Sequence, residues 1–146
     1  MDENRHDIMV KTSDRSALVE QIVLWGEASW WPRKSLMSFE RLTGGAIAPG
    51  TKYIQKVVLP RGPRWRAEVS ELTASGISRV FSDGMFSGYE RVNCEPVGEG
   101  FRVDYVMHYE IAGALNKLLW ALVFRRLHDQ NIEEILRQLK RYMEKA

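Results

Sequence analysis

The feature that most limits how this chain can fold is an alternating segment followed directly by a long helical one. In residues 101–111 every second position is apolar or aromatic: Phe101, Val103, Tyr105, Met107, Tyr109 and Ile111. The positions between them are polar or charged, except Val106. A period of two is typical of a strand with one face buried and the other in water. The pattern predicts an antiparallel strand whose aromatic face lies inward.

The residues after Ala112-Gly113 change to a helical period, which predicts a helix from about Ala114 to the C-terminus. The first half of this segment, Leu115 to Leu127, is apolar on nearly every side. We expect this half to be more enclosed than the second, or to cover something other than the sheet alone. The second half has one apolar stripe with spacings of three and four, made of Ile132, Ile135, Leu136, Leu139 and Met143.

Two short helices are expected after a first strand at His6–Thr12. The first helix covers Arg15–Trp25, where apolar residues recur at helical spacing. A second short helical piece carries Trp30 and Trp31. The residues that bound the first helix are the candidate N-caps Ser13 and Asp14 and the terminating glycine, Gly26.

In the middle of the chain, apolar segments alternate with turn-forming residues, which predicts further strands. They lie at Leu36–Leu42, Thr51–Leu59, Arg64–Thr73, Ile77–Ser82 and Met85–Glu95. Asp83-Gly84 is the strongest hairpin signal, because a two-residue turn of the mirror-image type needs positive φ. Closely spaced strands joined by short turns give a meander rather than parallel crossovers.

The expected fold is therefore one α+β domain over residues 1–146, a curved antiparallel sheet wrapped around a long C-terminal α-helix. The side chains of a strongly curved sheet do not fill its concave side. The helix closes that side, and we expect an apolar cavity between sheet and helix.

The composition of the chain indicates its cellular compartment and limits the classes of partner that it can bind. Cys94 is the one cysteine, so no intrachain disulfide can form, which fits a reducing cytoplasm. The polar start of the chain does not resemble a signal peptide, and the apolar run Leu118–Phe124 is far shorter than the ~18 residues of a membrane span. We expect a cytoplasmic protein. A net charge of +2 is too small to indicate nucleic-acid binding.

Several motifs in this order resemble the START-related helix-grip superfamily (SRPBCC), particularly the polyketide cyclase/dehydrase-like proteins. The motifs that carry the resemblance are Trp31-Pro32, Glu40–Gly45, Pro49–Tyr53, Glu95–Val103 and the helix end Leu136–Glu144. The resemblance implies a cavity for a hydrophobic ligand between sheet and helix. It does not imply one activity, because the superfamily includes lipid and quinone carriers, hormone-binding proteins and aromatase/cyclases.

The candidate ligand-binding residues are aromatic and apolar side chains of the expected sheet and helix. Each of them is also an ordinary core residue, and the tyrosines add hydroxyl groups that can orient a ligand. The set is Trp30, Phe39, Tyr53, Trp65, Phe81, Tyr105, Met107, Tyr109, Leu119, Trp120 and Val123.

Glu90 is a candidate catalytic acid or base in only one of two strand registers. It faces inward if Phe86 and Val92 do, whereas the opposite register turns Tyr89 inward. An inward carboxyl without a partner has a raised pKa, as catalytic acids often do. Two arginines, Arg41 and Arg79, have the same ambiguity, while Cys94 is better explained as a small buried hydrophobe than as a nucleophile.

No metal site or cofactor is expected. The three histidines, His6, His108 and His128, are not clustered in the sequence, and no phosphate loop or dinucleotide fingerprint occurs. There are two small basic clusters, Arg61 with Arg64 and Arg66, and Arg125-Arg126. They are explained by solvated charge, or by attraction to an anionic membrane or to a ligand head group beside the mouth of the pocket.

Three functions follow in order of preference. The first is binding or transport of a hydrophobic small molecule or lipid in the cavity, and the second is an aromatase/cyclase or dehydratase-type enzyme that uses the same cavity. The third is a protein-interaction module acting through the long helix, which an exposed apolar face at Leu118–Phe124 with a collapsed cavity would favour. The oligomeric state, monomer or homodimer, stays open.

Overall fold

The computed structural model describes residues 2–58 and 62–145. Its described residues form one antiparallel sheet of seven strands in the order β1-β7-β6-β5-β4-β3-β2. Strands β2 to β7 are sequential neighbours, and β1 pairs with β7 at the other edge. The strands are β1 (Asp2–Val10), β2 (Met37–Arg41), β3 (Lys52–Val57), β4 (Arg64–Thr73), β5 (Gly76–Ser82), β6 (Phe86–Val97) and β7 (Gly100–Ile111). The predicted α+β meander is confirmed.

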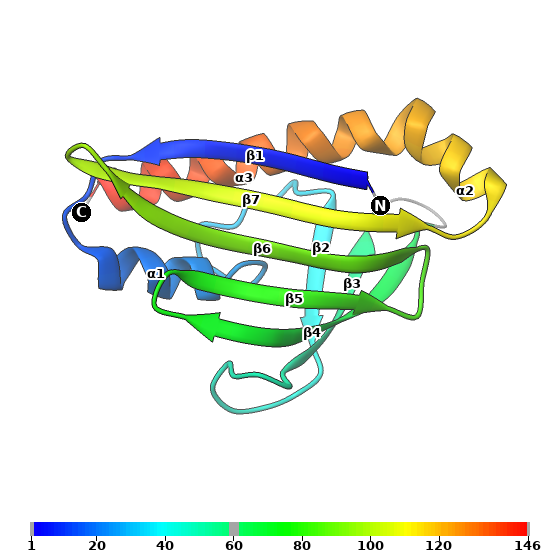
Figure 1. Cartoon of the computed structure of the whole chain (residues 1–146), viewed down its shortest axis with the longest axis horizontal. Coiled ribbons are helices and arrows are strands. Elements are labelled where there is room, and N and C mark those ends of the chain that lie inside the picture. Colours follow the sequence, from blue (N-terminus) through cyan, green and yellow to red (C-terminus); the bar gives the residue numbers. More distant parts are fainter. Residues whose placement is uncertain (1, 59–61, 146) are drawn as a thin grey trace.

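One long helical segment follows β7 and runs along the sheet, as Figure 1 shows. It consists of α2 (Ala114–Leu119), the π-helical turn η1 (Trp120–Phe124) and α3 (Arg125–Glu144). In η1 the backbone N–H of Arg125 donates to the carbonyl of Trp120, five residues earlier. The predicted stripe of α3 is confirmed, since all five of its residues are buried against the sheet, and the aromatic face of β7 is buried as well.

The first strand begins earlier than expected, at Asp2 rather than His6, and ends at Val10. Its polar first residues show no alternation, but pairing with β7 from Asp2 opposite Tyr109 keeps them extended. The helix α1 (Arg15–Val23) follows, and Oδ1 of Asp14 caps it by accepting from the N–H of Ala17 at 3.0 Å.

The prediction of a second short helix at Trp30 and Trp31 is wrong. Residues 24–36 form hydrogen-bonded turns, such as the one closed by the Trp31 N–H on the Ala28 carbonyl at 3.0 Å. Trp25 packs edge-on against both indoles, with ring centroids 6.3 Å from Trp30 and 5.3 Å from Trp31. Packing of these three rings, rather than helix propensity, determines the local backbone.

The hairpin at Asp83-Gly84 is present, but its turn has three residues, 83–85, instead of two. Asp83 adopts positive φ (55°), whereas Gly84 does not. A Cβ at Gly84 would lie 2.4 Å from the Arg64 carbonyl oxygen, so the glycine is required by a close backbone approach rather than by its torsion.

The expected enclosure of the first half of the long helix is also wrong. Leu115 and Leu122 are 68% and 72% exposed, while Trp120 is buried on the opposite side. The segment α2–η1 therefore covers the sheet with one face only and leaves a second apolar face uncovered.

Candidate functional site

A small cavity of about 30 Å³ lies between the concave face of the sheet and the long helix. Its inner wall is apolar and buried, formed mainly by Trp65, Phe81, Phe86, Met107 and Trp120. Its rim is half-buried and formed by Leu36, Val57, Pro63, Phe124 and Leu127. A cavity of this size has room for about one water molecule. A larger occupant must displace side chains of the rim.

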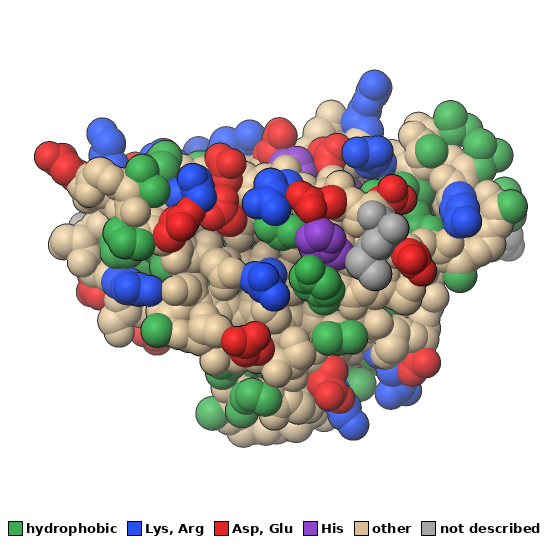
Figure 2. Space-filling view, viewed as in Figure 1, with side chains coloured by type: hydrophobic (Ala, Val, Ile, Leu, Met, Phe, Trp, Pro, Cys, Tyr) green, Lys and Arg blue, Asp and Glu red, His purple; other side chains and the backbone are tan. Residues whose placement is uncertain are grey.

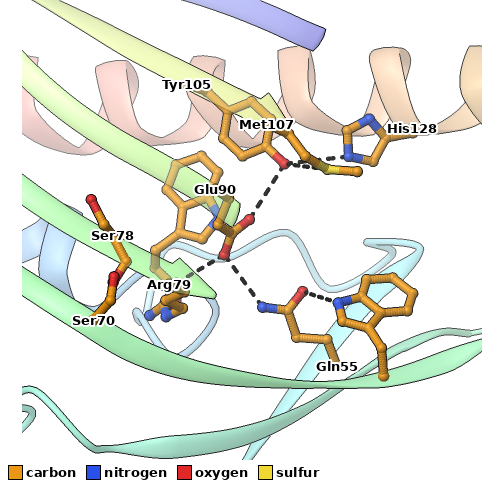
Figure 3. A network of polar contacts seen from close by, with 10 residues as sticks. Gln55, Ser70, Ser78, Arg79, Glu90, Tyr105, Met107 and His128 are labelled. Atoms are coloured by element: carbon orange, nitrogen blue, oxygen red, sulfur yellow. Dashed lines mark hydrogen bonds and ion pairs between the residues drawn. The ribbon is translucent and has the colours of Figure 1, made fainter. Parts of the chain in front are cut away.

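Glu90 faces this cavity from β6 and is 1% exposed, which resolves the open question of its strand register. Its carboxyl group has three neighbours, each at 3.3 Å: Nε2 of Gln55, Nη1 of Arg79 and the Tyr105 hydroxyl. Figure 3 shows these contacts converging from β3, β5 and β7. A period of two along β6 brings the carboxyl in with Phe86 and Val92.

The polar network extends from Glu90 across the cavity to the helix. The Tyr105 hydroxyl lies 3.4 Å from Nε2 of His128 on α3, so its proton can be donated to the imidazole or to the carboxyl group. At the other end, Oε1 of Gln55 accepts from Nε1 of Trp65 at 3.0 Å. The network thus joins polar atoms of five strands, β3 to β7, and of α3 beside a mostly apolar wall (Figure 3).

Arg79 places a positive charge behind Glu90. The side chain is fully buried, its Nη2 donates to the Trp25 carbonyl at 2.9 Å, and its guanidinium lies over the ring of Tyr53 at 4.6 Å. The other ambiguous arginine, Arg41, points outward and pairs with Glu27 at 3.0 Å.

Burial determines the protonation of this network. Burial raises the pKa of Glu90, while the Arg79 guanidinium and the donors of Gln55 and Tyr105 oppose the rise. Burial, together with Glu90, raises the pKa of Tyr105 well above its ordinary value. Burial lowers the pKa of His128 to about 4, so the imidazole is neutral at neutral pH. The network can therefore hold a polar ligand group, and its candidate acid or base is the carboxyl group of Glu90 rather than the Tyr105 hydroxyl.

The predicted ligand-binding residues divide into three groups in space. Those that line the cavity are Trp65, Phe81, Tyr105, Met107 and Trp120. Those that pack in the core away from it are Trp30, Phe39, Tyr53 and Tyr109. Leu119 and Val123 lie on the outside of the helix, 38% and 46% exposed, so the expectation that they line this cavity is wrong. Ligand contact by the first group stays a prediction.

Two residues of the network, Gln55 and His128, were not among the predicted site residues. Gln55 has the same strand parity as inward Tyr53 in the segment 52–57, so the period of two could have placed it. His128 lies four residues after Phe124, which also lines the cavity. The helical period could have placed it there.

The other candidates contribute no chemistry at this site. Within residues 2–58 and 62–145 no group of three or more potential metal ligands occurs. His108 faces outward and lies 3.4 Å from Glu3. Burial raises the pKa of Cys94, which agrees with an inert thiol. In the first basic cluster, Arg64 and Arg66 are exposed, and Arg61 lies outside the described residues.

No family model matches the chain, and no curated protein matches it either. Solved structures do match it along nearly their whole length. Protein TTHA0849 from Thermus thermophilus is 20% identical, with a TM-score of 0.73 and 99% of each chain covered. Major latex-like protein 151 from Panax ginseng is 10% identical, with a TM-score of 0.71 and 97% coverage of each.

A third similar structure is the Aha1 dimer from Colwellia psychrerythraea, with 14% identity, a TM-score of 0.64 and coverage of 99% of this chain and 97% of that one. Likeness at these identities shows the fold alone. The sheet order and the position of the long helix agree with it. The chain has a helix-grip fold, as the sequence resemblance predicted.

Proposed function

We propose that this chain binds a hydrophobic small molecule with at least one hydrogen-bonding group in the cavity between sheet and helix. The observation that carries the proposal is the polar group of Glu90, Tyr105 and His128 on a wall that is mostly apolar. Apolar burial would supply affinity, and the polar atoms would set the orientation of the ligand.

Asn131 gives further support, because one of its polar groups lacks a partner. Its Oδ1 accepts from the Ser35 hydroxyl and the Leu36 N–H, each at 3.2 Å, and so ties α3 to the rim. Its buried Nδ2 has no hydrogen-bond partner among the described residues, although the residue lines the cavity. An unpaired buried donor costs about 1–3 kcal/mol, and a ligand oxygen would remove that cost.

The present volume of about 30 Å³ requires the rim to open, since pockets for drug-sized ligands measure roughly 300–1,000 Å³. The rim side chains Leu36, Val57 and Phe124 are half-buried and lie at the boundary with solvent. Their displacement needs no change in the buried strands. We propose this boundary as the entry path.

The first experiment is native mass spectrometry of the purified chain, followed by denaturing extraction of any bound compound. A second experiment compares 2-naphthol with naphthalene by titration calorimetry. One added hydrogen bond should make 2-naphthol bind about fivefold more tightly. Tyr105→Phe should remove most of this preference, whereas Tyr89→Phe on the outer face should keep it. Equal binding of both compounds to wild type, or no binding at all, would contradict the proposal.

The second candidate function is an acid–base enzyme of the cyclase or dehydratase type. It is favoured by a specific observation, the cavity-facing Glu90 whose pKa burial raises, 3.3 Å from the Tyr105 hydroxyl. If a compound is extracted, incubation with fresh protein followed by mass analysis would reveal loss of water. Glu90→Gln should then abolish turnover and retain binding. Turnover that survives this substitution would exclude Glu90 as the acid or base.

We also propose that the chain acts in the cytoplasm, since Cys94 is a buried free thiol. Its oligomeric state, monomer or homodimer, is measured by sedimentation. A fluorescent fusion expressed in the native cells would test the compartment directly.

A further inference from the structure

The segment α2–η1 has an uncovered apolar face, which we call the docking face. It consists of five side chains that are between 38% and 72% exposed: Leu115, Leu118, Leu119, Leu122 and Val123. Spacings of three and four place the leucines on one side of the helix. Figure 2 shows hydrophobic side chains gathered at the end of the molecule where Figure 1 places α2. Contiguous exposed apolar patches mark interaction surfaces.

The charged side chains of the segment α2–η1 and of the residues that directly follow it all have one sign. Between Glu110 and Asp129 the sequence contains no acidic residue, whereas it contains three cations, Lys117, Arg125 and Arg126. All three cations are exposed. Arg126 lies four residues after Leu122 and therefore extends the same side of the helix. Leucine in the middle with cations at the border complements an anionic lipid surface, where tails take the apolar side chains and phosphates take the cations.

We propose that the docking face binds the surface of an anionic lipid bilayer, with α2–η1 lying in the plane of the interface. Within the described part of the chain, no helix is long and apolar enough to cross a membrane, so the contact lies along the surface. This goes beyond ligand binding. Trp120 and Phe124 of the same π-helical turn line the cavity, so docking would bring the rim to the membrane. Exchange of the ligand with the bilayer by that path rests on the proposed function.

The test is co-sedimentation of the full chain with vesicles of phosphatidylcholine alone or mixed with phosphatidylglycerol. Wild type should bind the mixed vesicles more tightly, and added salt should weaken that binding. Leu122→Glu should reduce it about tenfold or more, because a carboxylate replaces an inserted leucine. Each of Arg125→Gln and Arg126→Gln should reduce it about fivefold. Tyr142→Glu is the matched control, since Tyr142 is 43% exposed at the far end of the long helix.

Equal sedimentation of wild type and Leu122→Glu would overturn the proposal, and so would equal binding to both kinds of vesicle. Light scattering without lipid tests the alternative that the docking face is covered by a second copy of the chain. If Leu122→Glu converts a wild-type dimer into a monomer, the face belongs to a second copy and the proposal is overturned. Binding of 2-naphthol by Leu122→Glu in lipid-free buffer should equal that of wild type. A variant that no longer binds vesicles but still binds 2-naphthol therefore tests membrane docking separately from the ligand proposal.

Discussion

Protonation of His128 gives a prediction whose size follows from the structure. Its pKa is about 4 in the folded chain and 6.5 in the absence of burial. Above pH 6.5 the imidazole is neutral in both states, and between 6.5 and about 4 only the unfolded chain takes up a proton. The stability that this group contributes is therefore present above 6.5 and lost as the pH falls toward 4. At 1.36 kcal/mol per pH unit the loss amounts to about 3 kcal/mol.

The measurement is urea unfolding of wild type and His128→Gln near pH 7 and near pH 4. Glutamine can still contact the Tyr105 hydroxyl and does not titrate. Glu90 contributes with the opposite sign, because its raised pKa stabilises the fold as the pH falls. The difference between the two proteins isolates His128. Wild type should lose about 3 kcal/mol more than the variant.

The control is His108→Gln, because His108 lies on the outer face of β7. Its pH profile should follow that of wild type. Parallel profiles of wild type and His128→Gln between pH 7 and pH 4 would refute the reasoning. They would mean that water reaches the imidazole, or that the ring leaves its place beside Tyr105 on protonation without loss of stability.

Two further predictions concern stability. Arg79→Met leaves the carboxyl group of Glu90 buried without its cation and should cost about 3–5 kcal/mol in urea unfolding, while Arg79→Met combined with Glu90→Leu should recover most of that loss. A double variant as unstable as the single one would contradict the pairing. Leu139→Ala removes a fully buried side chain and should cost about 2–5 kcal/mol, whereas Leu122→Ala at 72% exposure should change stability by less than about 0.5 kcal/mol. A similar cost for both would mean that the docking face is covered.

The strand β7 and the apolar stripe of α3 were predictable because in each of them apolar residues recur in the sequence with the period of the secondary structure. Every second residue from Phe101 to Ile111 is buried, and so is the α3 stripe. The turn at Trp30 and Trp31 was not predictable in this way. Contact of both indoles with Trp25 is a tertiary interaction, and it overrides the local helical spacing.

The candidate site was predictable only in part, because β6 has large side chains on both faces. Tyr89 on the outer face stacks on the ring of His108, with centroids 4.9 Å apart, so an aromatic residue did not mark the inner face. The parity of Glu90 depends on pairing with β5, where Arg79 lies opposite. Polar residues that meet from five separate strands and a helix leave no shared signal along the sequence.

An exposed apolar face on the long helix together with a nearly closed cavity would favour the third function, a protein-interaction module. The buried polar network argues against that function. A domain that only presents a helix needs a packed core, and well-packed apolar residues usually replace a buried ion pair without loss of stability. Here Arg79 and Glu90 are almost fully buried, and the donor of Asn131 at the cavity wall has no partner in the described chain. Because an unpaired buried donor is costly unless something binds it, this network supports our proposal that the cavity is a ligand site.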